Sequence, residues 1–167
     1  GLRQRYSAGA VLPGARPVLS LDRFEAAAGE HWLVLGASGS GKTTLLNLAA
    51  GLLRPSEGEI TVAGEPLGRL AGAALDRWRG RTVGIVPQRL HLVGALRVID
   101  NLRLAQTLAG LPSDDERIRA MLEAVHVGDL AHRYPRELSQ GQAQRVAIAR
   151  AVINRPALVL ADEPTAN

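Results

Sequence analysis

The segment GASGSGKT, Gly36–Thr43, constrains the fold of this chain more than any other stretch of its sequence. An apolar run with strand character, Trp32–Leu35, precedes it, and a helix-like pattern, Thr43–Leu53, follows it. Glycines lack a Cβ atom, so the backbone can turn tightly and direct successive amides toward one anion. The positive end of the following helix adds to this attraction. We therefore predict a strand, a phosphate-binding loop (here the glycine loop) and a helix in succession.

Lys42, inside the glycine loop, is the only lysine of the chain, and every other residue among the 20 lysines and arginines is arginine. A planar guanidinium with a fixed fork of donors is too broad for such a turn, whereas an ammonium on a thin stem fits. We expect Lys42 to reach the β- and γ-phosphates of a nucleotide. The hydroxyl of Thr43 is then expected to bind Mg²⁺.

Composition restricts the remaining possibilities. The 167 residues are 46% hydrophobic and 22% charged, which is typical of one globular domain. There is no cysteine, so disulfides and thiolate metal sites are excluded. The net charge is +4, but the arginines are scattered from Arg3 to Arg155 and aromatics are 3%, so we expect no nucleic-acid partner. No apolar run is long enough to span a bilayer.

The rest of the sequence alternates between strand and helix patterns. Short strands are predicted at Glu59–Val62 and Thr82–Val86, and everything between Val86 and the last strand has helical character. The predicted helices are Val98–Ala109, one that starts with the capping box Ser113–Glu116, and one at about Gln140–Asn154.

The segment ALVLADE, Ala157–Glu163, ends in two carboxylates after an unbroken apolar run. Such a run predicts a central parallel strand that is buried on both faces. Ligands of open α/β sheets bind beyond the carboxyl ends of the strands. We therefore expect Asp162 to hold Mg²⁺ and Glu163 to act as the general base that activates a water molecule.

The segment LSQGQ, Leu138–Gln142, precedes the last predicted helix, and its Ser139 can cap that helix. With the segment RVAIARAVINRPALVLADEPTAN that follows, it resembles the ABC-type ATPases, whose signature is LSGGQ. Gln140 stands where that family usually has its first glycine. Gln88, after the strand Thr82–Val86, matches the glutamine that contacts Mg²⁺ or water in the family and senses the membrane subunit.

This resemblance implies an α/β fold: a phosphate-loop NTPase core with a small antiparallel β portion and an inserted helical subdomain. It implies one domain over 1–167, with the core at 1–89 and 138–167 and the helical subdomain at 90–137. The cofactors it implies are ATP and Mg²⁺; Gln88 and Glu163 would be catalytic, and Thr43, Gln88 and Asp162 would hold the metal. The nucleotide-contacting residues it implies are Tyr6, which would stack on adenine, and Gly36, Ala37, Ser38, Gly39, Ser40, Gly41, Lys42, Thr43, Thr44, Ser139, Gly141 and Gln142.

The resemblance also implies partners. The signature turn (Leu138–Gln142) of one copy would close over ATP held by the glycine loop of a second copy, and the dimer would act on integral membrane permease subunits at the cytoplasmic face. The segment GRLAGAALDRWRGRTVGIVPQRLHLVGALRVIDNL is similar to the group that serves lipoprotein release, macrolide export and cell division. Relatives continue with an aspartate loop and a catalytic histidine after the position of Asn167. We therefore expect a C-terminally truncated chain that binds nucleotide but hydrolyses it poorly.

Two alternatives remain open at this stage. In one, the ATPase drives transmembrane signalling in a cell-division complex and transports nothing. In the other, it is a soluble ABC ATPase of DNA repair or translation, although such proteins usually carry coiled-coil insertions or a second cassette. An unrelated phosphate-loop kinase or GTPase would leave the signature turn and Gln88 unexplained.

Overall fold

The computed structural model describes residues 1–5 and 17–163, and it divides into two compact units, Gly1–Ala71 and Gly72–Asn167. The first unit contains two small antiparallel pairs. β1 (Leu2–Gln4) pairs with β2 (Leu19–Leu21), and β3 (Thr61–Val62) pairs with β4 (Glu65–Pro66). The other elements of this unit are the helix α1 (Lys42–Ala49) and the 3-10 turn η1 (Leu67–Arg69).

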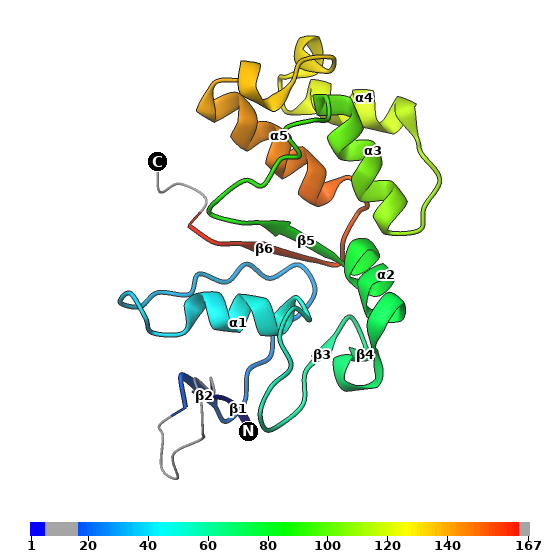
Figure 1. The fold of residues 1–167 in the computed structure, drawn as a ribbon. Coiled ribbons are helices and arrows are strands. Elements are labelled where there is room, and N and C mark those ends of the chain that lie inside the picture. Colours follow the sequence, from blue (N-terminus) through cyan, green and yellow to red (C-terminus); the bar gives the residue numbers. More distant parts are fainter. Residues whose placement is uncertain (6–16, 164–167) are drawn as a thin grey trace. The chain divides into compact units, whose positions relative to one another are not determined.

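The second unit contains a parallel strand pair and most of the helices (Figure 1). β5 (Val83–Val86) lies beside β6 (Leu158–Ala161), with Val83 opposite Leu158 and Val86 opposite Ala161. The helices of this unit are α2 (Gly72–Thr82), α3 (Val98–Leu108), α4 (Asp115–Ala124) and α5 (Gln140–Val152), with the 3-10 turns η2 (Gly128–Leu130) and η3 (Pro135–Glu137). The predicted α/β class with small antiparallel pairs and a helical segment after β5 is confirmed.

The main core of the second unit lies among its helices. α3, α4 and α5 bury apolar side chains against one another at the spacing of amphipathic helices. The buried residues of this core come from the three helices and from the turn after α4. They are Val98, Ile99, Leu102, Ile118, Leu122, Val127, Ala131, Val146, Ala149 and Ile153. This core fixes α5, and therefore the signature turn at its start, relative to the chain that follows β5.

Two predicted strands differ from the structure. Residues 32–35 form no strand, and Leu33 and Leu35 are 80% and 81% exposed. A strand requires a hydrogen-bonded neighbour, and among residues 1–5 and 17–163 no ladder includes this run. The last strand was predicted to be buried on both faces, but Val159 is 51% exposed because β6 pairs with β5 alone in the described sheets. The sequence shows where the apolar runs lie, but it does not show which strands, if any, pair with them.

Helix boundaries differ from the predictions for local reasons. α1 ends at Ala49 rather than near Leu53, because Gly51 takes a left-handed φ of 65° and the amide of Leu52 donates to the carbonyl of Asn47. α4 is capped by Asp114, not by the predicted Ser113, because the Asp114 carboxylate accepts from the amide of Arg117 at 3.0 Å. α2 has no counterpart among the helices predicted from the sequence.

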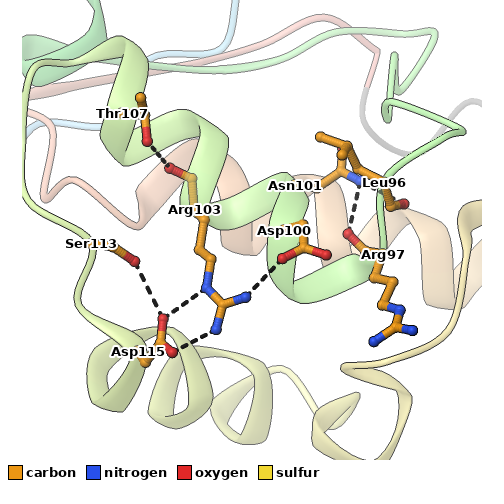
Figure 2. A network of polar contacts seen from close by, with 8 residues as sticks. All are labelled: Leu96, Arg97, Asp100, Asn101, Arg103, Thr107, Ser113 and Asp115. Carbon is orange, nitrogen blue, oxygen red and sulfur yellow. Dashed lines mark hydrogen bonds and ion pairs between the residues drawn. The ribbon is translucent and has the colours of Figure 1, made fainter.

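A polar network joins α3 to α4 (Figure 2). Arg103 lies between two carboxylates, with its Nε 2.8 Å from Asp115 Oδ1 and its Nη1 2.7 Å from Asp100 Oδ1. The hydrogen bond from Arg103 lowers the pKa of Asp115, and Ser113 adds a hydrogen bond to the same carboxylate. The network is about one-third exposed, so we assign it a role in orienting the helices rather than a large share of the stability.

Asn101, at the start of α3, holds the preceding loop by backbone contacts. Its side chain is fully buried, its Oδ1 accepts from the amide of Val93 at 2.8 Å, and its Nδ2 donates to the carbonyls of Val93, Leu96 and Arg97. Figure 2 shows the end of this loop, Leu96 and Arg97, against Asn101. The backbone from Val93 to Arg97 therefore depends on one side chain.

We expect Asn101→Leu to lower the free energy of unfolding by about 2–3 kcal/mol, because leucine fills the space but leaves buried backbone groups without partners. Urea denaturation of the variant measures this. The matched control is Thr107→Val, which removes an exposed hydroxyl bond within the same helix and is expected to cost less than about 0.5 kcal/mol. Equal losses in the two variants would contradict the role of Asn101.

Candidate functional site: a glycine loop, a carboxylate pair and a capped helix

The glycine loop is exposed from Gly36 to Ser40 and leads directly into α1. Gly39 and Gly41 have φ values of 79° and 92°, which side chains with a Cβ rarely adopt. At Gly41 a Cβ atom would also lie 2.9 Å from the carbonyl oxygen of Val18. The turn into α1 therefore requires glycine at this position for conformational and steric reasons.

Lys42 places its charge over the glycine loop. Its Nζ donates to the carbonyl of Gly36 at 2.7 Å and to that of Ala37 at 3.0 Å. α1 begins without a side-chain cap and without an acidic residue in its first turn. Helix N-termini without such partners attract anions, and the ammonium lies on the same exposed loop. This arrangement suits a ligand with several phosphate oxygens.

The predicted threonines differ in exposure. Thr43 is exposed on the first turn of α1, whereas Thr44 is 6% exposed. Only the backbone of Thr44 is therefore suited to a ligand at the loop. The exposed Ala37, Ser38 and Ser40 complete the turn. Tyr6 lies outside the described residues.

Gln88 and Glu163 meet beyond the carboxyl ends of β5 and β6. The register places Val86 opposite Ala161, and each of the two side chains follows its strand by the same number of residues. Gln88 Nε2 donates to Glu163 Oε2 at 3.1 Å. Parallel strands end at the same edge of a sheet, so this pair is a direct consequence of the β5–β6 register.

Asp162 and Glu163 have different environments. The amide of Asp162 donates to the carbonyl of Val86 at 3.0 Å, which extends the strand pair by one residue. Glu163 is exposed and takes a left-handed φ of 47°, an uncommon conformation for a side chain with a Cβ. The backbone therefore changes conformation between the two residues. Asp162 continues the strand pair, whereas the carboxylate of Glu163 lies beside Gln88 and is exposed to solvent.

The donor set fits Mg²⁺ held together with phosphate. Carboxylate and amide oxygens are hard ligands, and Mg²⁺ is usually bound by one or two carboxylates plus substrate phosphates. Within the described ranges no group of three or more His, Cys, Asp or Glu side chains could form a metal site without another ligand. Gln88 donates through its nitrogen to Glu163, so its oxygen remains able to accept or coordinate.

Ser139 caps α5 in a reciprocal capping box. Its Oγ accepts from the amide of Gln142 at 3.3 Å, and Gln142 Oε1 accepts from the amide of Ser139 at 2.8 Å. Because Oγ accepts in this box, the hydroxyl proton is still available to donate to an anion. A Cβ atom built at Gly141 meets no atom within 4 Å, so the signature turn presents an open surface there.

The two units carry different parts of the predicted site. The first contains the glycine loop, and the second contains Gln88, Asp162, Glu163 and the signature turn.

In the described residues no helix is both long and apolar enough to cross a membrane. Arg150 on α5, which donates to the carbonyls of Leu90 and His91 shortly after Gln88, could not be predicted, because nothing in its local sequence separates it from the many other arginines.

Comparisons with known proteins identify the family of the chain. The family model described as ABC transporter matches residues 19–166. The chain is 44% identical over 158 residues to the lipoprotein-releasing system ATP-binding protein LolD of Chromohalobacter salexigens, covering 92% of this chain and 67% of that protein. It is 40% identical over 167 residues to the macrolide export ATP-binding/permease protein MacB 1/2 of Paracoccus denitrificans, covering 99% of this chain and 25% of that protein.

The fold of the chain is also similar to that of a solved ATP-binding cassette. A dimeric post-hydrolysis state of the ATP-binding cassette MJ0796, bound to ADP and Pi, superimposes with a TM-score of 0.86 at 30% identity, over 99% of this chain and 72% of that one. The chain belongs to the ABC transporter family, and it is an ATP-binding, ATP-hydrolysing cassette of that family.

Proposed function

We propose that the intact protein binds Mg²⁺-ATP through the glycine loop of this chain and hydrolyses it in a dimer that drives membrane permease subunits. The observation that carries the proposal is the hydrogen bond between Gln88 and Glu163. It joins the predicted general base to the glutamine that, by the family resemblance, would sense the membrane subunit. The glycine loop with Lys42 provides phosphate binding in the same chain.

The residues divide the work by their chemistry. Lys42 and the amides at the start of α1 bind the phosphates, and the Ser139 hydroxyl donates to the nucleotide of the second copy. Glu163 accepts the proton of the attacking water, while Gln88 orients that carboxylate. Thr43, Gln88 and Asp162 would hold Mg²⁺, which neutralises charge on the phosphate oxygens when bound.

Pairing of two copies explains why the signature turn is open. Gly141 has free space around it within one copy, so this chain alone does not require glycine there. In an isologous dimer the same surface would face the phosphates bound by the partner. The similar cassette MJ0796, whose solved structure is a dimer bound to ADP and Pi, supports this arrangement.

Gly141→Ala therefore separates stability from activity. We expect the free energy of unfolding to stay the same or rise by up to about 1 kcal/mol, because alanine is the better helix former and meets no atom. ATPase activity is expected to fall roughly tenfold to a hundredfold, because a methyl group displaces the turn from the partner's phosphates. The control is Gly68→Ala, at another glycine with open space, which should leave the rate unchanged. Normal turnover in Gly141→Ala would contradict the composite site.

The membrane output is proposed from the relatives. LolD and MacB carry lipoprotein release and macrolide export in their names, so we propose release or export through permease subunits at the cytoplasmic face of the membrane. Affinity purification of the intact protein from detergent-solubilised membranes tests this. A co-purifying integral membrane subunit supports the proposal, and its absence contradicts it.

Purification together with a transport assay in proteoliposomes distinguishes the alternatives. A signalling complex would retain a membrane partner and ATPase activity, but it would move no lipid-linked or hydrophobic substrate in proteoliposomes. A DNA-repair or translation ATPase would instead purify with nucleic acid in a salt-dependent manner. The family matches to LolD and MacB favour the first proposal over both.

A further inference from the structure

Arg150 connects the helix of the signature turn to the chain that follows Gln88. It lies on α5, the helix that Ser139 caps, and its guanidinium reaches the segment between β5 and α3. Its Nη1 donates to the carbonyl of His91 at 2.7 Å, and its Nη2 donates to the carbonyl of Leu90 at 2.7 Å. Figure 1 draws α5 beside this segment.

The guanidinium of Arg150 is a charged group, but its acceptors are two neutral backbone carbonyls. Arg150 is partly buried, and loss of solvent lowers its pKa. No carboxylate in residues 1–5 or 17–163 forms an ion pair with it, so two backbone carbonyls are the acceptors that stabilise its charge. Burial of a cation without a counter-ion is costly. A neutral side chain would fill the same space at lower cost, so stability alone does not account for an arginine here.

The segment that Arg150 holds is fixed at both of its ends. His91 has a left-handed φ of 47°, and its carbonyl and that of Leu90 both accept from Arg150. Further along, Asn101 holds the backbone from Val93 onward. Gln88 lies two residues before Leu90, the first of the two carbonyls that accept from Arg150, and it donates to Glu163. The position of Gln88 relative to Glu163 therefore depends on where Arg150 holds the backbone.

We propose that Arg150 is a positioning residue: it fixes the backbone after Gln88 to the signature helix and so keeps Gln88 within reach of Glu163. This inference rests on the proposed function, in which Glu163 is the base. In addition, α5 would connect the nucleotide of the partner copy to the catalytic residues of its own copy. Ser139 at its start contacts the partner's nucleotide, and Arg150 further along controls the glutamine beside the base of its own copy.

The test is Arg150→Met in the full-length protein with its membrane partner. Methionine retains a flexible apolar stem but cannot donate to the two carbonyls. We expect kcat for ATP hydrolysis to fall roughly tenfold to a hundredfold, because small misplacements of a catalytic group have effects of this size. KM for ATP should change less than about twofold, because the nucleotide-binding loop is untouched.

Arg81→Met is the matched control. Arg81 on α2 also clamps two carbonyls, those of Ala109 at 2.7 Å and Gly110 at 2.9 Å, but these lie at the end of α3. Its loss should lower the melting temperature in a similar way and leave kcat unchanged. Arg150→Lys keeps the charge and loses the paired contact, and a fall in its kcat supports the proposal even if Arg150→Met does not fold.

A double-mutant cycle distinguishes positioning from general damage. If Arg150 acts through Gln88, Arg150→Met should reduce kcat little further in a Gln88→Ala background, whereas independent effects would multiply. Multiplying effects, or equal kcat losses in Arg150→Met and Arg81→Met, would overturn the proposal. ATP binding and hydrolysis by the unmodified protein are measured in parallel. Their absence would overturn the proposed function itself, and normal values with an unchanged Arg150→Met would overturn only this inference.

Discussion

Glu163→Gln is expected to reduce ATP hydrolysis by about 10²–10⁴-fold, the usual contribution of a general base, while leaving ATP affinity nearly unchanged. Glu163 is exposed at the end of β6, and the proposed mechanism uses its carboxylate only to accept a proton. Glutamine has the same shape, and its side-chain oxygen can still accept from Gln88 Nε2. The variant therefore removes the base and keeps the local geometry.

Loss of the base should also stabilise the dimer. If ATP joins two copies and hydrolysis separates them, a variant that binds but does not hydrolyse ATP remains dimeric. Light scattering after size-exclusion chromatography in Mg²⁺-ATP should show dimers of Glu163→Gln and mainly monomers of the unmodified protein. Glu116→Gln, at an exposed carboxylate on α4, is the control and should behave like the unmodified protein. Normal hydrolysis by Glu163→Gln would show that the base is another group.

Lys42→Ala is expected to weaken ATP binding by about tenfold to a hundredfold, which corresponds to the loss of a charged hydrogen bond of 1.5–3 kcal/mol. The ammonium donates to two carbonyls of its own loop, those of Gly36 and Ala37, and the Lys42 side chain is only partly buried. Its removal should therefore change the free energy of unfolding by less than about 1 kcal/mol. Isothermal titration calorimetry with ATP measures the affinity.

Two comparisons make the Lys42 prediction specific. Lys42→Arg keeps the charge, yet it should also weaken binding, because the broad guanidinium does not fit a turn built for a compact ammonium. Arg54→Ala removes an exposed arginine that donates to the carbonyl of Leu70 in the same unit, and it should leave ATP affinity unchanged. Full affinity in Lys42→Arg would show that charge alone matters, and loss of affinity in Arg54→Ala would point to general damage.

Much of the site was predictable because its signals are local. The glycine loop appears as a compact pattern, because its turn depends on φ values that glycine favours, and the structure has these values at Gly39 and Gly41. Ser139 was predicted to cap α5 and does so. The predicted family is confirmed by the match over residues 19–166. Each of these features depends on residues close in sequence.

Other features were not predictable, because they depend on distant partners. The run Trp32–Leu35 has strand composition but no strand neighbour in the described sheets, and periodicity does not report the presence of a neighbour. The cap of α4 shifted by one residue, from Ser113 to Asp114, because both side chains can accept a hydrogen bond and the local pattern does not separate them.

The sequence by itself determined the chemical groups that this protein presents: a glycine turn with one ammonium, a carboxylate pair after an apolar strand, and a serine-capped helix. These depend on backbone conformation and side-chain type within short segments. Only the tertiary structure decided that Gln88 meets Glu163 and that Arg150 on α5 donates to the backbone that follows Gln88. The reason is that strand register and helix packing bring together residues far apart in sequence, and no local pattern records those contacts.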